Sequence, residues 1–277
     1  MHGSLALKNG VLWVARYGAE ATVAAFDLDG HKLGPGFGLG TRESGAPQVT
    51  GLALDDDHSL WLADARSQKV RAFSVFGVEG EAIVHEYLGG VSDVAVRGED
   101  DERQLWVASS GMSHGNVLLF DSGGECTSSL RSMGDPAVSF RDIAGLALGE
   151  HLSYVCERRG ARVQVFRDAE FHFAFGLDSD PRFEPSAVAA LSDERVLVTT
   201  GGRQSGLHLF DAAGRHLQCL ADTGTDMGQL FEPSDVVTLE GADDRHTRVV
   251  VIDCDGDRVQ VFSLAGRCYG AFTELDE

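Results

Sequence analysis

The stretch VVVIDCDGDRVQVFSLAG, at residues 249–266, carries an outline that recurs along the whole chain. It consists of an apolar run, an acidic turn, a basic residue, the pattern V-x-V-F and a second turn. The V-x-x-F core, or the similar L-x-x-F, recurs every 44 to 52 residues and ends in turn at Phe26, Phe73, Phe120, Phe166, Phe210 and Phe262. A repeat of this length is typical of the blades of a β-propeller.

Each repeat contains four short runs separated by turns rich in Gly, Asp and Asn, which predicts four antiparallel strands. The first and innermost strand is predicted at residues 4–7, 50–54, 92–96, 144–148, 186–191 and 234–239. The second is predicted at residues 11–15, 59–63, 104–108, 151–155, 195–199 and 248–252. We therefore expect an all-β fold, a six-bladed β-propeller of four-stranded antiparallel blades, with residues 1–277 forming a single domain.

Two details recur in register between repeats. Trp13, Trp61 and Trp106 occupy one position of the second strand, and Tyr154 takes the same position in the fourth repeat. Large aromatic side chains at such a position are expected to fill the space between neighbouring blades. An acid also precedes a base by five residues in the pairs Asp64 and Lys69, Glu157 and Arg162, and Asp253 and Arg258. This spacing spans a tight hairpin and predicts a cross-strand ion pair.

Composition limits the partners and the location of the protein. The chain has 43 acidic and 23 basic residues, a net charge of −20, which opposes a polyanion and argues against nucleic acid as a partner. No apolar run reaches the ~18 residues of a membrane span, and no signal peptide is visible, so we expect a soluble, cytoplasmic protein without a membrane partner. The five cysteines lack C-x-x-C spacing and are interpreted as free thiols.

The repeat resembles that of the NHL-repeat β-propellers. The likeness is carried by GQLFEPSDVV at 228–237, SLWLAD at 59–64 and RVQVF at 162–166 and 258–262, and it covers nearly the whole chain. Relatives of this family include protein-binding scaffolds, RNA-binding domains and a few enzymes, so the resemblance implies the fold more strongly than the function.

The two chain ends show no sign of an exchanged strand. Blade one begins at its own first strand, and blade six ends with its own fourth strand at residues 267–272. We therefore expect side-chain packing to close the ring and both ends to fray.

Candidate binding residues lie at one end of the ring. We call this the connecting end, because it holds the connections between blades and the turns between second and third strands; the opposite end is the turn end, whose turns carry many acids. Asp93 and Asp235 begin the inner strands of blades three and six, on opposite sides of the channel, and Asp142 is expected just above them. The arginines predicted to take part in binding on this face are Arg66, Arg158, Arg159 and Arg203. The carboxylates could bind a cation, an amine or a peptide, or they could be ordinary polar residues of a wet channel.

The motifs of catalysis and of metal binding are poorly represented. DCDGD at 253–257, DLDG at 27–30 and DSDP at 178–181 lack the further ligands of a calcium loop and are interpreted as turns. The ten histidines are dispersed rather than aligned at the channel. No cofactor is predicted, although calcium or another divalent ion in the channel is left open.

The sequence thus favours a non-catalytic interaction scaffold that binds a protein or peptide on the connecting end, around the central channel. The alternative is a metal-assisted hydrolase or lyase, similar to the lactonase-type propellers, with the channel carboxylates as ligands. The sequence leaves the partner, the oligomeric state and any neighbouring domains open.

Overall fold

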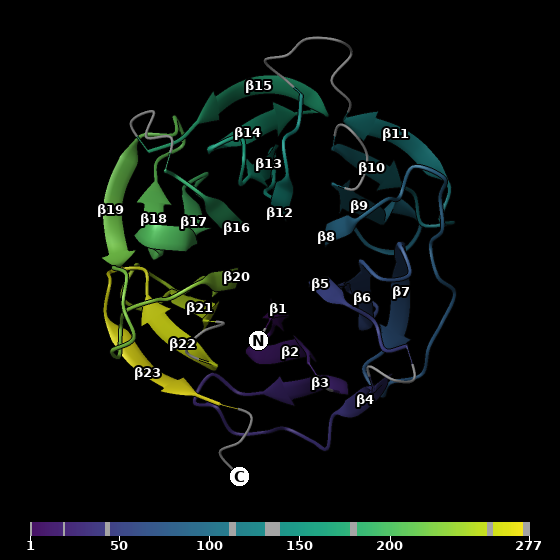
Figure 1. The fold of residues 1–277 in the computed structure, drawn as a ribbon, viewed down its shortest axis with the longest axis horizontal. Helices are drawn as coiled ribbons and strands as arrows, with labels where there is room; N and C mark the ends of the chain where they lie inside the picture. Colours follow the sequence, from purple (N-terminus) through teal and green to yellow (C-terminus); the bar gives the residue numbers. More distant parts are fainter. Residues whose placement is uncertain are drawn as a thin grey trace.

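The computed structural model describes residues 2–18, 20–41, 45–110, 115–130, 139–177, 182–253 and 257–273, and its sheets form a ring around a central axis (Figure 1). Blade one contains β1 (His2–Lys8), β2 (Val11–Tyr17), β3 (Glu20–Phe26) and β4 (Phe37–Thr41). Blade two contains β5 (Val49–Leu54), β6 (Ser59–Asp64) and β7 (Lys69–Ser74). Blade three contains β8 (Val91–Arg97), β9 (Gln104–Ser109), β10 (Asn116–Phe120) and β11 (Cys126–Leu130).

The second half of the chain repeats the arrangement. Blade four contains β12 (Ile143–Leu148), β13 (Leu152–Glu157), β14 (Arg162–Arg167) and β15 (Glu170–Phe175). Blade five contains β16 (Pro185–Ala190), β17 (Val196–Thr200), β18 (Gly206–Phe210) and β19 (His216–Ala221). Blade six contains β20 (Pro233–Leu239), β21 (Arg248–Asp253), β22 (Arg258–Ser263) and β23 (Cys268–Phe272). Two single-turn 3-10 helices, Asp100–Glu102 and Gly202–Gln204, lie in turns.

The predicted six-bladed β-propeller is confirmed, with one correction at blade two. Five sheets have four antiparallel strands in sequence order from the channel outward, but the sheet of blade two has three. Its fourth position is taken by an irregular segment that meets β7 only at isolated bridges, between Val70 and Ile83 and between Phe73 and Glu79. The prediction of four strands was wrong here because the segment after Ser74 turns back at Gly77 and pairs only locally.

In blades one and five, the recurring phenylalanine of the V-x-x-F pattern packs against a phenylalanine at the end of the outer strand of the preceding blade. Phe175 of blade four packs on Phe210 of blade five, with ring centroids 4.9 Å apart, and Phe272 of blade six packs on Phe26 of blade one at 5.4 Å. A glycine completes each contact, because a Cβ on Gly214 or Gly30 would meet the ring of the packed phenylalanine at less than 3 Å. Both glycines also have positive φ angles, which few other residues adopt without strain.

The aromatic position of the second strand is buried between blades, as predicted. Trp61 and Trp106 are 7% and 1% exposed, and Tyr154 is 2% exposed. Trp61 packs in one cluster with Val94 and Leu105 of blade three. Trp13 is the exception, since it is only half-buried.

The ring closes between blades six and one without an exchanged strand, because β1 pairs with β2 and β23 with β22. Leu5, Val14, Phe26, Ile252 and Phe272 share one apolar cluster across this junction. The predicted fraying stays a prediction for β23, whose residues are mostly half-exposed, whereas Gly3 to Ala6 of β1 are buried and are expected to resist exchange.

The three hairpin pairs lie directly opposite each other in the sheets, as predicted. Glu157 and Arg162 form an ion pair at 2.8 Å, and Asp253 and Arg258 form one at 3.1 Å. Asp64 instead accepts hydrogen bonds from the amides of Gln48, Arg66 and Ser67, so the blade-two acid organises its turn.

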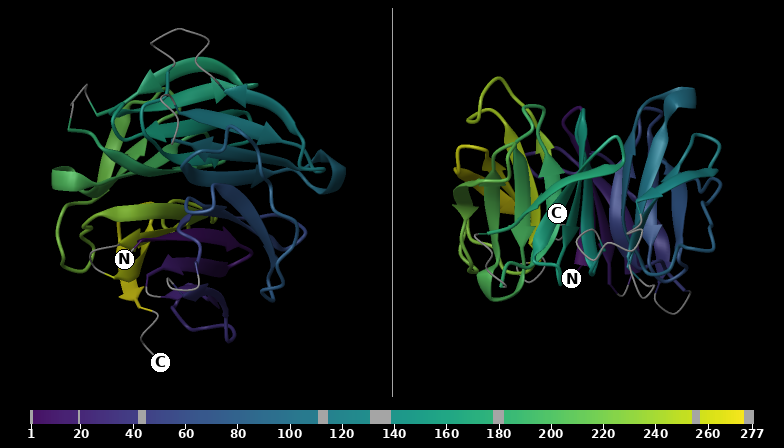
Figure 2. Two further views of the ribbon diagram at one scale, coloured as in Figure 1. Left: turned by 45° about the vertical axis from the view of Figure 1, so that its right-hand side comes forward. Right: turned by 90° about the horizontal axis from the view of Figure 1, so that it is seen from above.

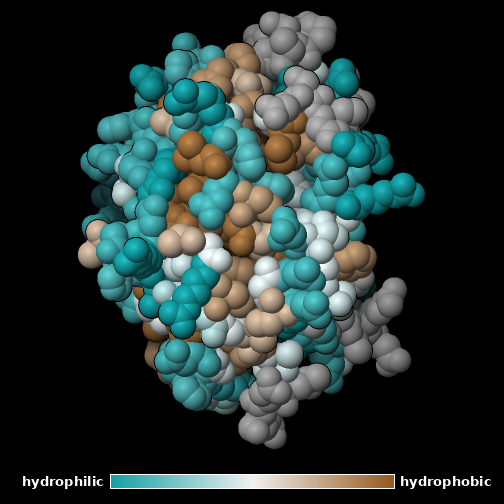
Figure 3. Space-filling view, turned by 90° about the vertical axis from the view of Figure 1, so that its left-hand side faces the viewer, coloured by the Kyte–Doolittle hydropathy of each residue, from teal (hydrophilic) through white to brown (hydrophobic). Residues whose placement is uncertain are grey.

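The molecule is a short cylinder, with the start of β1 near its axis and the end of β23 at its rim (Figure 1; Figure 2). The rim at blade five is mainly hydrophilic, with interrupted apolar areas (Figure 3). Exposed apolar side chains of the rim include Leu217 and Tyr269.

Candidate functional site at the channel mouth

A cavity of about 510 Å³ opens at the connecting end, and all six blades contribute to its wall. Gly3 and Tyr17 come from blade one, Thr50 and Ala65 from blade two, and Ser92 and Ser110 from blade three, while the remaining blades contribute the charged residues Asp142, Arg158, Glu184 and Glu232. The residues come from the inner strands, the turns between second and third strands and the connections, so the predicted division of the ring into two ends is confirmed.

Three carboxylates stand at one repeat position, immediately before the inner strands of blades four, five and six. These residues are Asp142, Glu184 and Glu232, and Gly90 holds the same position in blade three. Asp142, Glu232 and Gly90 have φ angles of 62°, 58° and 62°, in the left-handed region. This conformation turns the chain sharply into the inner strand and leaves the side chain at the mouth.

The three carboxylates differ in how they are paired. Glu232 accepts a hydrogen bond from the amide of Gly202 at 3.0 Å, and Asp142 lies 3.7 Å from Nε of Arg159. No hydrogen bond or ion pair joins the Glu184 side chain to another residue in the described part of the chain, and its carboxylate packs against Gly202. The mouth therefore holds one carboxylate that is available to a ligand, Glu184, and two that each have a single polar contact, Asp142 and Glu232.

The predicted arginines take different places. Arg158 lines the cavity, and Arg159 contacts it indirectly through Asp142. Arg66 and Arg203 are exposed in turns of the same end but are not among the residues that line the cavity. Of the predicted set, the structure thus brings Asp142, Arg158 and Arg159 together at the mouth.

Asp93 and Asp235 lie outside this lining and bind the backbone of the next blade. Oδ2 of Asp93 accepts a hydrogen bond from the amide of Leu146 at 2.7 Å, which links blade three to blade four. Oδ2 of Asp235 accepts from the amide of Leu5 at 2.7 Å and from Oγ of Ser4 at 2.6 Å, which links blade six to blade one. In both residues Oδ1 accepts from the amide of the following residue.

Burial raises the pKa of both inner carboxyl groups. For Asp93 the removal from water is the largest cause, and the negative charge of Asp235 adds to it. For Asp235 the removal from water outweighs the hydrogen bonds from Ser4, Leu5 and Val236, which act in the opposite direction. Both groups consequently hold their protons more tightly than an exposed aspartate does.

Glu184 and Glu232 are the residues of the mouth that sequence reasoning did not select. A signal for them exists, since both lie in the repeated words RFEPSAV and LFEPSDV, at 182–188 and 230–236. The proline of these words accounts for the entry into the inner strand, but the shared glutamate directly before it marks the channel mouth.

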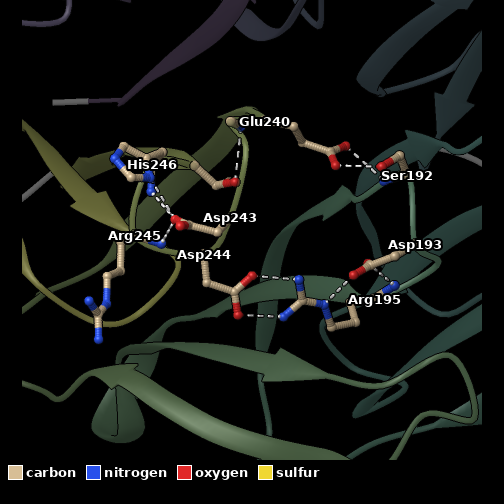
Figure 4. Close-up of polar contacts among 10 residues, drawn as sticks. Ser192, Asp193, Arg195, Glu240, Asp243, Asp244, Arg245 and His246 are labelled. Carbon is tan, nitrogen blue, oxygen red and sulfur yellow. Dashed lines mark hydrogen bonds and ion pairs between the residues drawn. The ribbon is translucent and has the colours of Figure 1, made fainter.

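At the turn end, acidic side chains of blade six accept hydrogen bonds from residues of blade five (Figure 4). Asp244 of blade six accepts two hydrogen bonds from the guanidinium of Arg195 of blade five, at 2.9 and 2.7 Å. Glu240 accepts from the amide and hydroxyl of Ser192. These contacts hold blades five and six together, and Arg195 keeps the pKa of Asp244 below its ordinary value.

The candidate calcium loops fit turns where they can be described. In DLDG at 27–30, Asp27 accepts hydrogen bonds from the amides of Asp29 and His31 and closes the turn after β3. Asp27, Asp29 and His31 are the one group of three close metal-ligand side chains within the described ranges, and they lie away from the channel lining. DSDP at 178–181 and the centre of DCDGD at 254–256 lie outside the described residues.

No protein-family model matches the chain, and no curated protein sequence matches it. Among solved structures, a nidogen and laminin complex matches with a TM-score of 0.70 and 15% identity over 95% of this chain and 94% of that one. Virginiamycin B lyase from Staphylococcus aureus matches with a TM-score of 0.66 and 10% identity, covering 99% and 85% of the two chains. A gluconolactonase from Xanthomonas campestris matches with a TM-score of 0.62 and 15% identity, covering 96% and 83%.

These likenesses lie at identities that define a fold and not an activity, and the similar proteins include both enzymes and a component of a protein complex. In the described part of the chain, no helix has the length and apolar character needed to cross a membrane. The comparisons therefore place this chain among proteins that share the six-bladed β-propeller fold.

Proposed function

We propose that the protein is a non-catalytic interaction scaffold whose channel mouth binds a positively charged segment of a protein or peptide. The observation that carries this proposal is the cavity of about 510 Å³, with Asp142, Glu184 and Glu232 on three successive blades. A lysine, an arginine or an amino-terminal amine would pair with Glu184, whose carboxylate has no partner among the described residues. Arg158 would pair with an acid or a carbonyl group of the same ligand.

The available charge at the mouth favours a cation over a polyanion. Three carboxylates face one lining guanidinium, and the chain as a whole carries a net charge of −20. A field of this sign attracts a basic segment from a distance and weakens as salt is added. The nidogen and laminin complex shows that a propeller of this shape occurs in a protein complex.

The test uses a defined probe, a fluorescein-labelled pentapeptide with three lysines, and fluorescence polarisation at low salt. Glu184→Gln removes the available carboxylate and is expected to weaken binding about tenfold, equivalent to about 1.4 kcal/mol. Glu99→Gln is the matched control, because Glu99 is exposed at the turn end and makes no capping hydrogen bond with its side chain.

Two outcomes would contradict the scaffold proposal. One is equal binding of the lysine peptide by the two variants, and the other is equal binding of a peptide in which glutamates replace the lysines. Either result would show that the mouth carboxylates do not select the ligand.

The second candidate function, a metal-assisted hydrolase or lyase, rests on the fold likeness to virginiamycin B lyase and to the gluconolactonase. Asp93 and Asp235 suit it poorly as ligands, because all four of their carboxylate oxygens accept amide hydrogen bonds. Asp142, Glu184 and Glu232 would be the channel residues to hold a divalent ion. A thermal shift with calcium that is lost in Glu184→Gln, but kept in Glu99→Gln, would favour this alternative.

A further inference from the structure

A second cavity, of about 460 Å³, opens at the turn end between blades one and two. Its wall is mainly apolar and includes Val11, Trp13, Leu33, Phe37, Leu54 and Phe76. None of these residues contributes to the channel mouth, and the two cavities lie at opposite ends of the ring. The cavity is thus separate from the site of the proposed function.

Two departures from the repeat create the cavity. The first is the irregular fourth segment of blade two, which leaves Phe76 87% exposed at the rim. The second is a histidine in blade two at the repeat position where blade three has Arg103, an arginine that covers the tryptophan of blade two. The Arg103 guanidinium lies 5.1 Å from the ring centroid of Trp61, whereas His58 holds the place of Arg103 opposite Trp13.

The lining has little charge to offer a ligand. Lys8 is the permanently charged residue of the wall, and its ammonium already pairs with Asp56. The turn that provides Leu54 and His58 also contains Asp55, Asp56 and Asp57, so its charge opposes an anion. An ion entering an apolar cavity without a free partner would lose its hydration uncompensated. The cavity therefore favours an uncharged molecule.

We infer that this cavity binds a small, uncharged aromatic molecule, held between Trp13, Phe37 and Phe76. Its volume lies within the range of about 300–1,000 Å³ that is common for small-molecule sites. Aromatic walls favour a flat aromatic ligand through stacked and edge-to-face contacts. The half-buried Trp13 and the exposed Phe76 and Leu33 give such a molecule apolar surface that is otherwise left in water.

The experiment uses two dyes that differ by one sulfonate. N-phenyl-1-naphthylamine is uncharged, and 8-anilino-1-naphthalenesulfonate carries the same rings with a negative charge. Titrated against the full chain, the uncharged dye is expected to give a saturable rise in fluorescence, and the anionic dye is not expected to saturate in the same range.

A pair of variants locates the dye. Leu33→Asp places a charge on the cavity wall and is expected to weaken binding of the uncharged dye at least about tenfold, equivalent to about 1.4 kcal/mol. Val84→Asp introduces the same charge at an exposed residue that does not line the cavity and should change binding less than about twofold. Leu33 and Val84 are 52% and 72% exposed, so both variants are expected to fold, which unchanged melting curves would verify.

Three results would overturn the inference: equal dye binding by the two variants, equally tight binding of the anionic dye, or uptake of an aromatic peptide without uptake of the uncharged dye. Glu184→Gln should leave dye binding unchanged, so failure of this inference is distinguishable from failure of the scaffold proposal.

Discussion

Single carboxylates link the blades of this propeller. Asp93 and Asp235 stand at equivalent places in opposite blades, and each binds the amide of an inner strand in the next blade. A carboxylate that accepts backbone hydrogen bonds satisfies donors that would otherwise be buried without partners. The same group that resembles a ligand in the sequence therefore acts as a link between blades in the structure.

Asp235→Ala is expected to lower the free energy of unfolding by about 1–3 kcal/mol, because the amide of Leu5 and the hydroxyl of Ser4 lose their acceptor. Asp93→Ala is expected to cost a similar amount through Leu146. Asp101→Ala, at an exposed acid of the turn end, is the control and should stay within about 0.5 kcal/mol. Urea unfolding at pH 5 measures all three, and unchanged stability in the two inner variants would contradict the linking role.

The raised pKa of Asp93 predicts a dependence of stability on pH. A carboxyl group that binds its proton more tightly in the folded chain stabilises the fold at low pH. That contribution is lost as the pH rises from the ordinary value of 3.8 through the raised value. Relative to the wild type, Asp93→Asn should therefore gain stability with rising pH, by up to about 1.4 kcal/mol per pH unit in this window.

Urea unfolding of the wild type and of Asp93→Asn between pH 4 and about pH 8 tests this dependence, because the difference between the two cancels the other acids. A difference that is constant, or that moves in favour of the wild type, would show that the Asp93 carboxyl is not held in its protonated form.

The positions of these residues could be predicted, but their contacts could not. The repeat register placed Asp93 and Asp235 on opposite sides of the channel, because equivalent residues of a closed array face its axis. The amides that bind them belong to Leu146 and Leu5 in the following blade, and the packing of neighbouring sheets sets how close these amides lie to the carboxyl groups. The order of residues within one repeat contains no information about that packing.

Among the elements, the hairpin between the second and third strands holds its own acidic residue and, in blade six, also the connection that precedes the blade. In blade four, Arg162 and Gln164 both donate to the buried Glu157, and in blade six Arg258 and Gln260 both donate to Asp253. Arg258 and Gln260 also donate to the carbonyl of Gln229, which fixes the preceding connection. The five-residue spacing predicted the pair, but the glutamine and the fixed connection emerged only from the structure.

Arg162→Ala is expected to destabilise the protein by up to about 3 kcal/mol, because it leaves the fully buried Glu157 without its counter-ion. Lys69→Ala, at the same repeat position in blade two, should cost less than about 0.5 kcal/mol, since Asp64 is satisfied by its own turn. Thermal and urea unfolding of the two variants measure the contrast. Equal losses would contradict a stabilising role of the Glu157–Arg162 ion pair beyond what Lys69 contributes without one.

For the whole molecule, the junction between blades six and one is built like the junctions inside the ring. Phe272, Phe26 and Gly30 repeat the arrangement of Phe175, Phe210 and Gly214 between blades four and five. The sequence predicted closure by side chains, because blade one begins with its own first strand. The apolar cavity between blades one and two was not predicted, because it arises where the repeat fails and no periodic argument applies.

Phe272→Ala and Phe175→Ala are expected to lower the free energy of unfolding by similar amounts, about 3 kcal/mol each. Both side chains are 9% exposed and end the outer strand of their blade, so their burial is matched. Guanidinium unfolding compares them directly. A much smaller loss for Phe272→Ala would show that blades six and one are joined more weakly than the internal blades.

The start of β1 at the ring axis has a practical consequence. Gly3 forms part of the wall of the channel-mouth cavity, whereas β23 ends at the rim (Figure 1). A purification tag or fusion partner attached ahead of β1 would emerge inside the mouth and compete with any ligand for that space. The same tag attached after β23 would emerge beside Val259, at the rim of the connecting end, and would stay away from the channel axis.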